Sequence, residues 1–166
     1  RMRQQTSFIF DLDGTLTDSV YQNVFAWKTS LDSEDIPLAM WRIHRKIGMS
    51  GGLMLKMLAR ETGLEIKPDQ AKRLSDKHDK AYKDLQGQIT ALPGAVELLD
   101  ALNRDQLKWC IATSGGMDTA AINLKALGLD IAEVNLITRD DVKYGKPDPD
   151  LFLAAASKLN VPIEDC

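Results

Sequence analysis

The chain has 166 residues, of which 44% are hydrophobic and 27% are charged, and 21 Lys and Arg against 24 Asp and Glu give a formal net charge of −3. This composition is typical of a folded globular protein and excludes a disordered chain. No Lys- or Arg-rich run is present, so we expect no nucleic-acid partner. No apolar stretch approaches the ~20 residues that span a bilayer. The N-terminal RMRQQTSF also lacks the apolar run of a signal peptide, so we expect a cytoplasmic protein with no membrane contact.

The first predicted strand is SFIF, residues 7–10, and two carboxylates, Asp11 and Asp13, come directly after it. Two such charges ~4 Å apart repel by about 1 kcal/mol in water and by about 4 kcal/mol near a protein surface. Either one carboxylate takes up a proton or a divalent cation lies between them. Mg²⁺ suits such a pair, because it is commonly bound by one or two carboxylates together with waters and phosphate oxygens.

The residues after this pair, Gly14 and Thr15, predict a sharp turn. In such a turn, backbone N–H groups can face an anion, which would make the segment a metal-supported anion site. The alternative is a plain Asp-Gly turn without a ligand.

The segment from 20 to 92 is predicted to be helical. Its ~70 residues are too many for a structureless connection. Apolar residues recur at helical spacing in four stretches, residues 20–31, 37–48, 51–63 and 67–86. We therefore predict a helical domain, residues 20–90, inserted after the first strand. His78 lies in a strongly charged stretch of it and is expected at the surface.

Strands and helices alternate in the remainder of the chain. Strands are predicted at residues 107–113 and, more weakly, at 133–138, and helices at residues 93–106, 118–129 and 148–162. This alternation predicts an α/β protein with a Rossmann-like parallel sheet between two helical layers, formed by residues 1–19 and 91–166. We expect Trp27, Trp41 and Trp109 to fill hydrophobic cores.

DLDGTLTDS, residues 11–19, resembles the first motif of the haloacid dehalogenase superfamily, Asp-x-Asp-Gly-Thr. Two later motifs follow in the required order, since CIATSGG supplies Thr113 at the end of a predicted strand and KYGKPDPDLF supplies Lys146 ahead of a predicted helix. The helical insertion resembles the cap domain of many members. The resemblance thus extends over the whole chain.

The resemblance implies Mg²⁺-dependent hydrolysis of a small-molecule phosphate ester. Asp11 would attack phosphorus and become an aspartyl phosphate, and Asp13 would act as general acid and then as general base. Thr113 would donate a hydrogen bond to a phosphoryl oxygen, and Lys146 would neutralise charge beside Asp11. Asp11 and Asp13 are also the expected metal ligands.

Six further residues are predicted to bind the substrate through backbone N–H groups or through side chains of the inserted helices: Gly14, Thr15, Arg45, Lys46, Ser114 and Gly115. Each also has a structural interpretation. Ser114 and Gly115 can form the turn that begins the next helix, and Arg45 and Lys46 can be the solvated end of a helix.

Asp13 favours a phosphate monoester as substrate, because by the resemblance members that cleave carbon–halogen bonds lack an acid there. A β-type sugar phosphomutase is the alternative enzyme. Phosphomutases of this type grip a second phosphate with an Arg after a Gly-x-Ser element, and here KIGMSGG has Gly51 at that place. We therefore favour a hydrolase. A truncated, non-catalytic binding module is the third possibility.

A fourth motif of the family, an acidic pair that completes the metal site, is expected beyond Cys166. Asp140 and Asp141 are only weaker candidates, because they precede Lys146. We therefore expect the chain to lack the last strands of the core and, by itself, to bind Mg²⁺ poorly and turn over slowly. We expect a monomer or a weak dimer.

Overall fold

The computed structural model describes residues 6–166. Residues 1–5, which belong to the predicted core and to the segment that we compared with a signal peptide, lie outside this range. The chain forms a parallel sheet of three strands in the order β1-β4-β5, with β1 at Phe8–Phe10, β4 at Trp109–Ala112 and β5 at Leu136–Ile137. Each strand lies inside its predicted range. The third is much shorter than predicted because residues 131–134 form turns and bends, held by the Ala132 N–H that donates to Asp130 Oδ1 at 2.9 Å.

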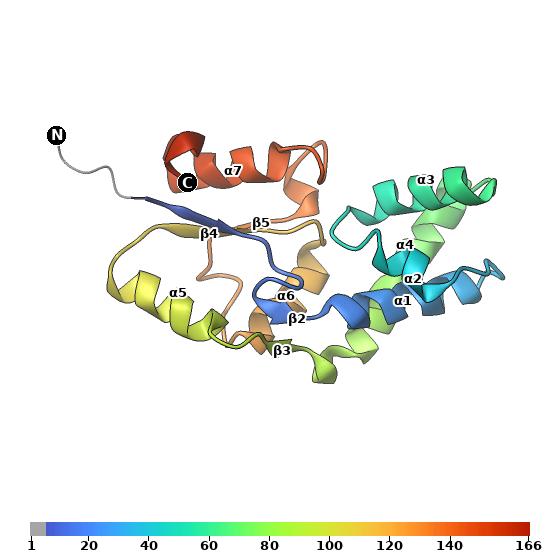
Figure 1. The fold of residues 1–166 in the computed structure, drawn as a ribbon, viewed down its shortest axis with the longest axis horizontal. Coiled ribbons are helices and arrows are strands. Elements are labelled where there is room, and N and C mark those ends of the chain that lie inside the picture. The colour runs from blue at the N-terminus through green and yellow to red at the C-terminus, as the bar shows by residue number, and fades with distance from the viewer. Residues whose placement is uncertain (1–5) are drawn as a thin grey trace.

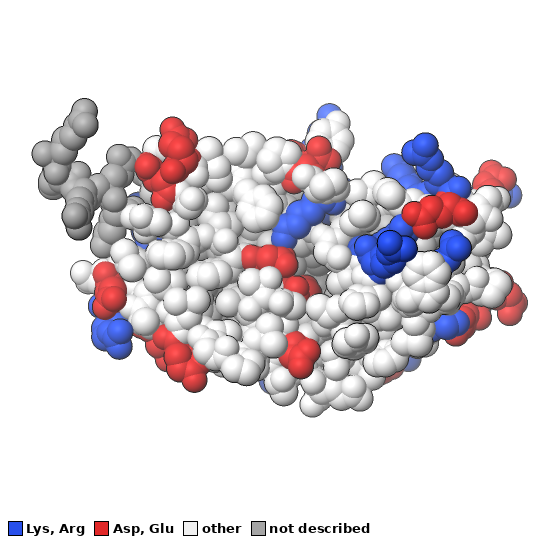
Figure 2. All heavy atoms as spheres, viewed as in Figure 1, with Lys and Arg blue, Asp and Glu red and all other residues white. Residues whose placement is uncertain are grey.

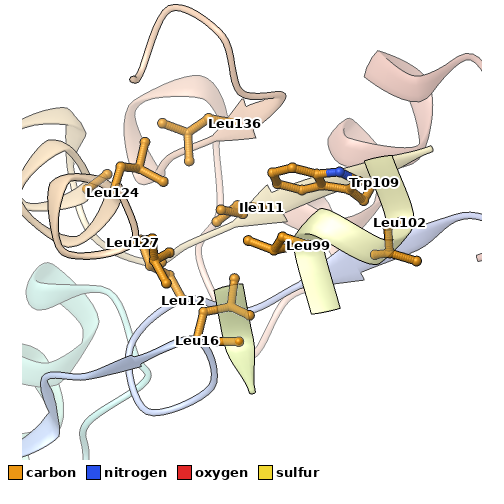
Figure 3. Packing of buried hydrophobic residues seen from close by; sticks show 11 residues of the cluster. Leu12, Leu16, Leu99, Leu102, Trp109, Ile111, Leu124, Leu127 and Leu136 are labelled. Atoms are coloured by element: carbon orange, nitrogen blue, oxygen red, sulfur yellow. The ribbon is translucent and has the colours of Figure 1, made fainter. Parts of the chain in front are cut away.

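Helices cover both faces of this sheet (Figure 1), as the sequence predicted. On one face lie α5 (Ala95–Arg104) and α6 (Met117–Ala126), and on the other lies α7 (Asp150–Leu159). Figure 3 shows the hydrophobic core between the sheet and the helices α5 and α6, in which leucines of these helices meet Trp109 and Ile111 of β4. The structure is therefore the predicted three-layer α/β/α arrangement.

Residues 20–90, which we call the helical segment, form four helices beside the sheet: α1 (Val20–Asp32), α2 (Met40–His44), α3 (Gly51–Thr62) and α4 (Pro68–Asp84). They enclose a core of their own, which includes Trp27, Leu55 and Leu74. Two helix ends have a sequence signal, since Pro68 begins α4 and Gly63, with φ of 72°, ends α3. The second helix is shorter than predicted because the chain turns before Gly48, whose φ is 102°.

A short antiparallel pair joins the two ends of the helical segment. β2 (Thr17–Asp18) lies before α1, and it pairs with β3 (Thr90–Ala91), which follows α4. The remaining elements are three 3₁₀ turns, Gln86–Gln88, Arg139–Asp141 and Ile163–Asp165. The pair holds both connections of the helical segment next to the sheet core.

Two expectations about side chains are wrong. Trp41 is 55% exposed instead of filling a core, and the guanidinium groups of Arg42 and Arg45 lie over its ring at 5.2 and 5.6 Å. His78, expected at the surface, is only 6% exposed because α4 packs this ring against α1.

Figure 2 shows side chains of both signs interspersed over the face that it presents, with a group of Lys and Arg at the end formed by the helical segment. In residues 6–166, no helix is both long enough and apolar enough to cross a bilayer.

Candidate active site

A cavity of about 550 Å³ lies between the sheet core and the helical segment. The carboxyl ends of β1 and β4 contribute Asp11 and Thr113 to its wall, and the helical segment contributes Trp27, Lys56 and His78. Ligands of parallel α/β sheets bind at this end of the strands. The cavity is therefore the candidate site for the predicted chemistry.

Asp11 lies directly after β1 and is held by a cation from a distant part of the chain. Lys146 Nζ donates to Asp11 Oδ1 at 2.5 Å and to the carbonyl of Ala112, the last residue of β4, at 2.9 Å. Thr15 Oγ1 donates to Asp11 Oδ2 at 3.3 Å. The side chain of Asp11 remains 39% exposed, so its carboxylate is oriented and still reachable from the cavity.

Asp13 is held by neutral donors instead. In residues 6–166, the hydrogen bonds to its carboxylate all reach Oδ1: from Ser19 Oγ at 2.7 Å, Tyr82 OH at 3.3 Å and Asn23 Nδ2 at 3.4 Å. Burial raises the pKa of Asp13, and the neighbouring charge of Asp11 adds to this rise, while the Ser19 hydrogen bond opposes it. The surroundings thus favour a protonated Asp13.

Asp11 and Asp13 are the candidate metal ligands of the cavity, whose wall also includes Asp79, Asp118, Asp140 and Asp148. Within the described part of the chain, no group of three or more His, Cys, Asp or Glu side chains gathers at one point. Asp140 accepts from the Met117 N–H at 3.1 Å and Asp141 from the Thr138 N–H at 2.7 Å, so both hold the starts of helical turns. Asp11 and Asp13, which directly follow β1, suit Mg²⁺, which takes one or two carboxylates and leaves positions for water and phosphate oxygens.

Thr113, at the end of β4, is 1% exposed and contributes to the cavity wall. Its Oγ1 accepts from the Gly115 N–H at 3.1 Å, so the hydroxyl proton of Thr113 remains a donor. Ser114 Oγ donates to the carbonyl of Gly48 at 2.9 Å and so joins the sheet core to the loop after α2. Ser114 and Gly115 both line the cavity, but the hydroxyl of Ser114 and the N–H of Gly115 already donate to other groups of the protein.

Gly14 and Thr15 form a closed turn beside the cavity. The Gly14 N–H donates to the backbone carbonyl of Thr17 at 2.8 Å, and the Thr15 N–H donates to the backbone carbonyl of Leu12 at 3.2 Å. These amides therefore do not face an anion, contrary to our expectation. Gly14 has φ of 76°, and a Cβ there would lie 2.7 Å from Val20, so this turn requires glycine.

Arg45 and Lys46 are not brought into the cavity. Lys46 Nζ donates to Glu61 Oε1 at 2.6 Å, and this hydrogen bond lowers the pKa of Glu61. The Arg45 guanidinium lies over the exposed ring of Trp41. Both side chains thus have partners within the helical segment, and Lys46, which is buried, is not the solvated helix end of the structural interpretation either.

Polar residues around Asp13 that were not predicted from the sequence include Ser19, Asn23, His78 and Tyr82. Ser19 and Asn23 are four residues apart, so the first turns of α1 bring both to Asp13. That spacing was the available signal. His78 Nε2 lies 2.8 Å from Asn23 Oδ1, and this contact depends on how α4 packs against α1.

Comparisons with known proteins agree with this geometry. The family model described as "haloacid dehalogenase-like hydrolase" matches residues 6–166. Hexitol phosphatase A of Escherichia coli is 36% identical over 164 residues, covering 96% of this chain and 71% of that protein. Beta-phosphoglucomutase of Bacillus subtilis is 31% identical over 163 residues, covering 95% and 71%. The crystal structure of a hydrolase from Pseudomonas syringae is 75% identical with a TM-score of 0.96, covering 98% of this chain and 74% of that one. The chain therefore belongs to the haloacid dehalogenase-like hydrolases.

Proposed function

We propose that the protein is a Mg²⁺-dependent phosphatase that hydrolyses a small phosphorylated sugar or sugar alcohol through an aspartyl phosphate on Asp11. The observation that carries the proposal is the hydrogen bond from Lys146 to Asp11, two residues 135 positions apart, where Asp11 lines one cavity together with Asp13 and Thr113. The substrate class comes from the relatives, one of which is named as a hexitol phosphatase.

In the first step, an oxygen of Asp11 forms a bond to phosphorus and the bond from phosphorus to the leaving oxygen breaks. Protonated Asp13 gives its proton to that oxygen, which leaves as an alcohol. In the second step, Asp13 takes a proton from water, and the water oxygen attacks phosphorus. The bond to Asp11 breaks, inorganic phosphate is released, and Asp13 is again protonated. The raised pKa of Asp13 supports its part as the acid.

Lys146 and Thr113 bind and orient the phosphoryl group in this scheme. The Lys146 ammonium lies against Asp11 and offsets negative charge as the phosphoryl group arrives. The hydroxyl proton of Thr113 is the donor for a phosphoryl oxygen. Asp11 and Asp13 would hold Mg²⁺, whose contribution is to lower the repulsion between the carboxylates and the phosphate oxygens.

The helical segment, residues 20–90, acts as a cap over a core formed by residues 1–19 and 91–166. It turns Asn23, Lys56 and His78 toward the cavity, and these groups suit a leaving alcohol that carries several hydroxyls. Removing water around the phosphoryl group is the expected benefit of such a cap.

A sugar phosphomutase is the second candidate, because beta-phosphoglucomutase is among the relatives. One contact favours hydrolysis. A Cβ at Gly51 would lie 2.9 Å from the Trp27 ring, so an Arg at this position, expected for phosphomutases of this type, needs a displacement of that ring.

The proposal is tested with the complete protein, as its gene encodes it, and with a panel of sugar and sugar-alcohol phosphates in Mg²⁺. We expect release of inorganic phosphate that disappears in Asp11→Asn, with the variant's thermal unfolding showing that it is folded. Isomerisation of a sugar phosphate with little phosphate release would support the phosphomutase instead. Phosphate release that persists in folded Asp11→Asn would overturn the mechanism, and the absence of any turnover would favour a binding module.

A further inference from the structure

A line of hydrogen bonds runs from α4 to Asp13. His78 Nδ1 lies 2.9 Å from Asp79 Oδ1, and His78 Nε2 lies 2.8 Å from Asn23 Oδ1. The other end of the Asn23 amide, Nδ2, donates to Asp13 Oδ1 at 3.4 Å. His78 is therefore connected to a candidate catalytic carboxylate through the side-chain amide of Asn23, and both of its ring nitrogens are in hydrogen-bond contacts.

The chemistry of the groups fixes the direction of this line. Asp13 Oδ1 accepts from Ser19 Oγ at 2.7 Å, so it is an acceptor in this line, and Nδ2 is the end of the Asn23 amide that donates to it. The Asn23 oxygen therefore faces His78 Nε2, and that nitrogen must donate as well.

The ring of His78 is also fixed in its plane. It stacks on Trp27 with 4.2 Å between ring centres and 25° between planes, and on Tyr82 with 5.9 Å and 19°. It is only 6% exposed, so water has little access to replace a lost partner. Nε2 consequently has one direction in which to donate, toward Asn23.

Without that donor, the Asn23 amide is oriented in this line only by the long, 3.4 Å hydrogen bond from its Nδ2 to Asp13 Oδ1. A reversed amide would set its oxygen against Asp13 Oδ1, which accepts from Ser19 and Tyr82 as well, so two acceptors would be in contact. The hydrogen bonds from Ser19, Asn23 and Tyr82 hold Oδ1, which leaves the other oxygen of Asp13, Oδ2, to face the substrate. The orientation of Asn23 thus governs how Asp13 meets the leaving oxygen.

We propose that His78 is a positioning residue for the hydrolysis, which acts through Asn23 to hold the Asp13 carboxyl group in line with the leaving oxygen. This inference rests on the proposed function. It assigns to α4 of the helical segment a part in orienting the acid, in addition to covering the cavity.

Two substitutions at position 78 separate the two hydrogen bonds. The amide nitrogen of Gln stands near the position of Nε2, so His78→Gln keeps a donor for Asn23. The amide nitrogen of Asn stands near Nδ1, so His78→Asn keeps a donor for Asp79 only. We expect His78→Asn to lower kcat about tenfold, with KM within about twofold, and His78→Gln to retain kcat within about threefold.

Two further variants complete the experiment. Asn23→Ala is expected to lower kcat about tenfold, and adding His78→Asn to it should lower kcat no further, because both residues act on Asp13 along one path. His44→Gln is the matched control, since His44 is exposed and its ring lies tilted against that of Tyr21, outside the cavity. Its kinetics should equal those of the parent protein.

The outcomes decide between positioning and simpler roles. Equal kcat in His78→Asn and His78→Gln, a rise in KM alone, or a fall in melting temperature without a fall in kcat would each overturn the proposal. Independent, multiplying effects of Asn23→Ala and His78→Asn would also overturn it. Asp11→Asn is measured in parallel: if it retains activity, the proposed function itself fails, whatever the His78 variants do.

Discussion

The two carboxylates of the cavity stand two residues apart and have opposite surroundings. Asp11 belongs to the side formed by the sheet core, where the Lys146 ammonium donates to it at 2.5 Å. Asp13 belongs to the side formed by the helical segment, where Ser19, Asn23 and Tyr82 surround one of its oxygens. A cation balances the charge of Asp11, whereas burial raises the pKa of Asp13. Neighbours in sequence are thus prepared for different chemistry by the elements that pack against each of them.

The two sides also differ in how they are built. The partners of Asp11 come from strand ends and from the loop ahead of α7, which are tied to the sheet by the bond from Lys146 to Ala112. The partners of Asp13 are Ser19, which directly precedes α1, and residues of α1 and α4, so they depend on how these two helices pack outside the sheet. We therefore expect changes on the Asp11 side to act on charge and changes on the Asp13 side to act on proton transfer.

Removing the acid is expected to have the largest effect on catalysis among the variants that test this comparison. Asp13→Asn keeps an oxygen for the donors around Oδ1 and cannot transfer a proton. We expect kcat to fall by about 10³, within the range of general acid catalysis, in steady-state assays of phosphate release. A substrate with an aryl leaving group, which needs less protonation, should recover part of the loss. Equal losses with aryl and alkyl phosphates would contradict the role of Asp13 as acid.

The same variant gives a pH dependence of stability with a definite sign. The pKa of Asp13 is raised above its ordinary value of 3.8 in the folded protein. As the pH rises above 3.8, the unfolded chain loses this proton first, so ionisation favours unfolding. Asp13→Asn removes that cost. Its urea midpoint, measured with EDTA present, should exceed that of the parent near neutral pH and should approach it below pH 3.8.

Removing the cation is expected to have the next largest effect. Lys146→Met keeps most of the aliphatic stem and deletes the charge beside Asp11, so we expect kcat to fall about 10²-fold. Lys143→Met is the control, because the Lys143 ammonium lies over the Tyr144 ring and is not bonded to Asp11. If both variants lose activity equally, the hydrogen bond from Lys146 to Asp11 does not explain the loss of kcat, which would contradict the proposed role of Lys146.

A smaller effect is expected where the two sides of the cavity touch. Ser114→Ala removes the hydrogen bond to the carbonyl of Gly48 and so loosens the helical segment over the sheet core. A neutral hydrogen bond of this kind contributes about 1 kcal/mol, so KM should rise several-fold while kcat changes little. Ser157→Ala on α7 is the control. A fall in kcat alone would indicate that Ser114 acts in the chemical step.

The smallest effect on catalysis is expected at Glu34, on the helical segment away from the cavity. Arg73 and Lys77 hold the pKa of Glu34 down, at about 2 instead of 4.5. A lowered pKa adds stability above pH 4.5 that is lost as the pH falls toward 2, the opposite sign to Asp13. Glu34→Gln should keep its kcat and lose stability at neutral pH, with the difference from the parent closing in acid. A change in kcat would contradict the expectation that Glu34 contributes to stability and not to catalysis.

The fold and the sheet side of the site were largely predictable from the sequence. Strand periodicity and the alternation with helices predicted the parallel sheet, and parallel strands bring their carboxyl ends to one edge. Asp11 and Thr113, predicted at the ends of two strands, therefore lie in one cavity. The roles assigned to these residues remain proposals.

The side of the site formed by the helical segment was less predictable, because the periodicity of apolar residues does not determine how helices pack against one another. His78 was expected at the surface from its charged neighbours, and packing of α4 on α1 buries it. Lys46 was expected to meet the substrate and instead pairs with Glu61, and Trp41 was expected in a core and is exposed. Each error concerns which face of a helix meets a neighbour.

The most direct test of the account is to identify the residue that carries phosphate during turnover. The complete protein is mixed with its substrate and Mg²⁺, quenched in acid within one turnover, and its peptides are analysed by mass spectrometry after reduction of the acyl phosphate. The account predicts a modified Asp11 and no modification in Asp11→Asn. Rapid turnover with phosphate on another residue, or on none, would contradict it.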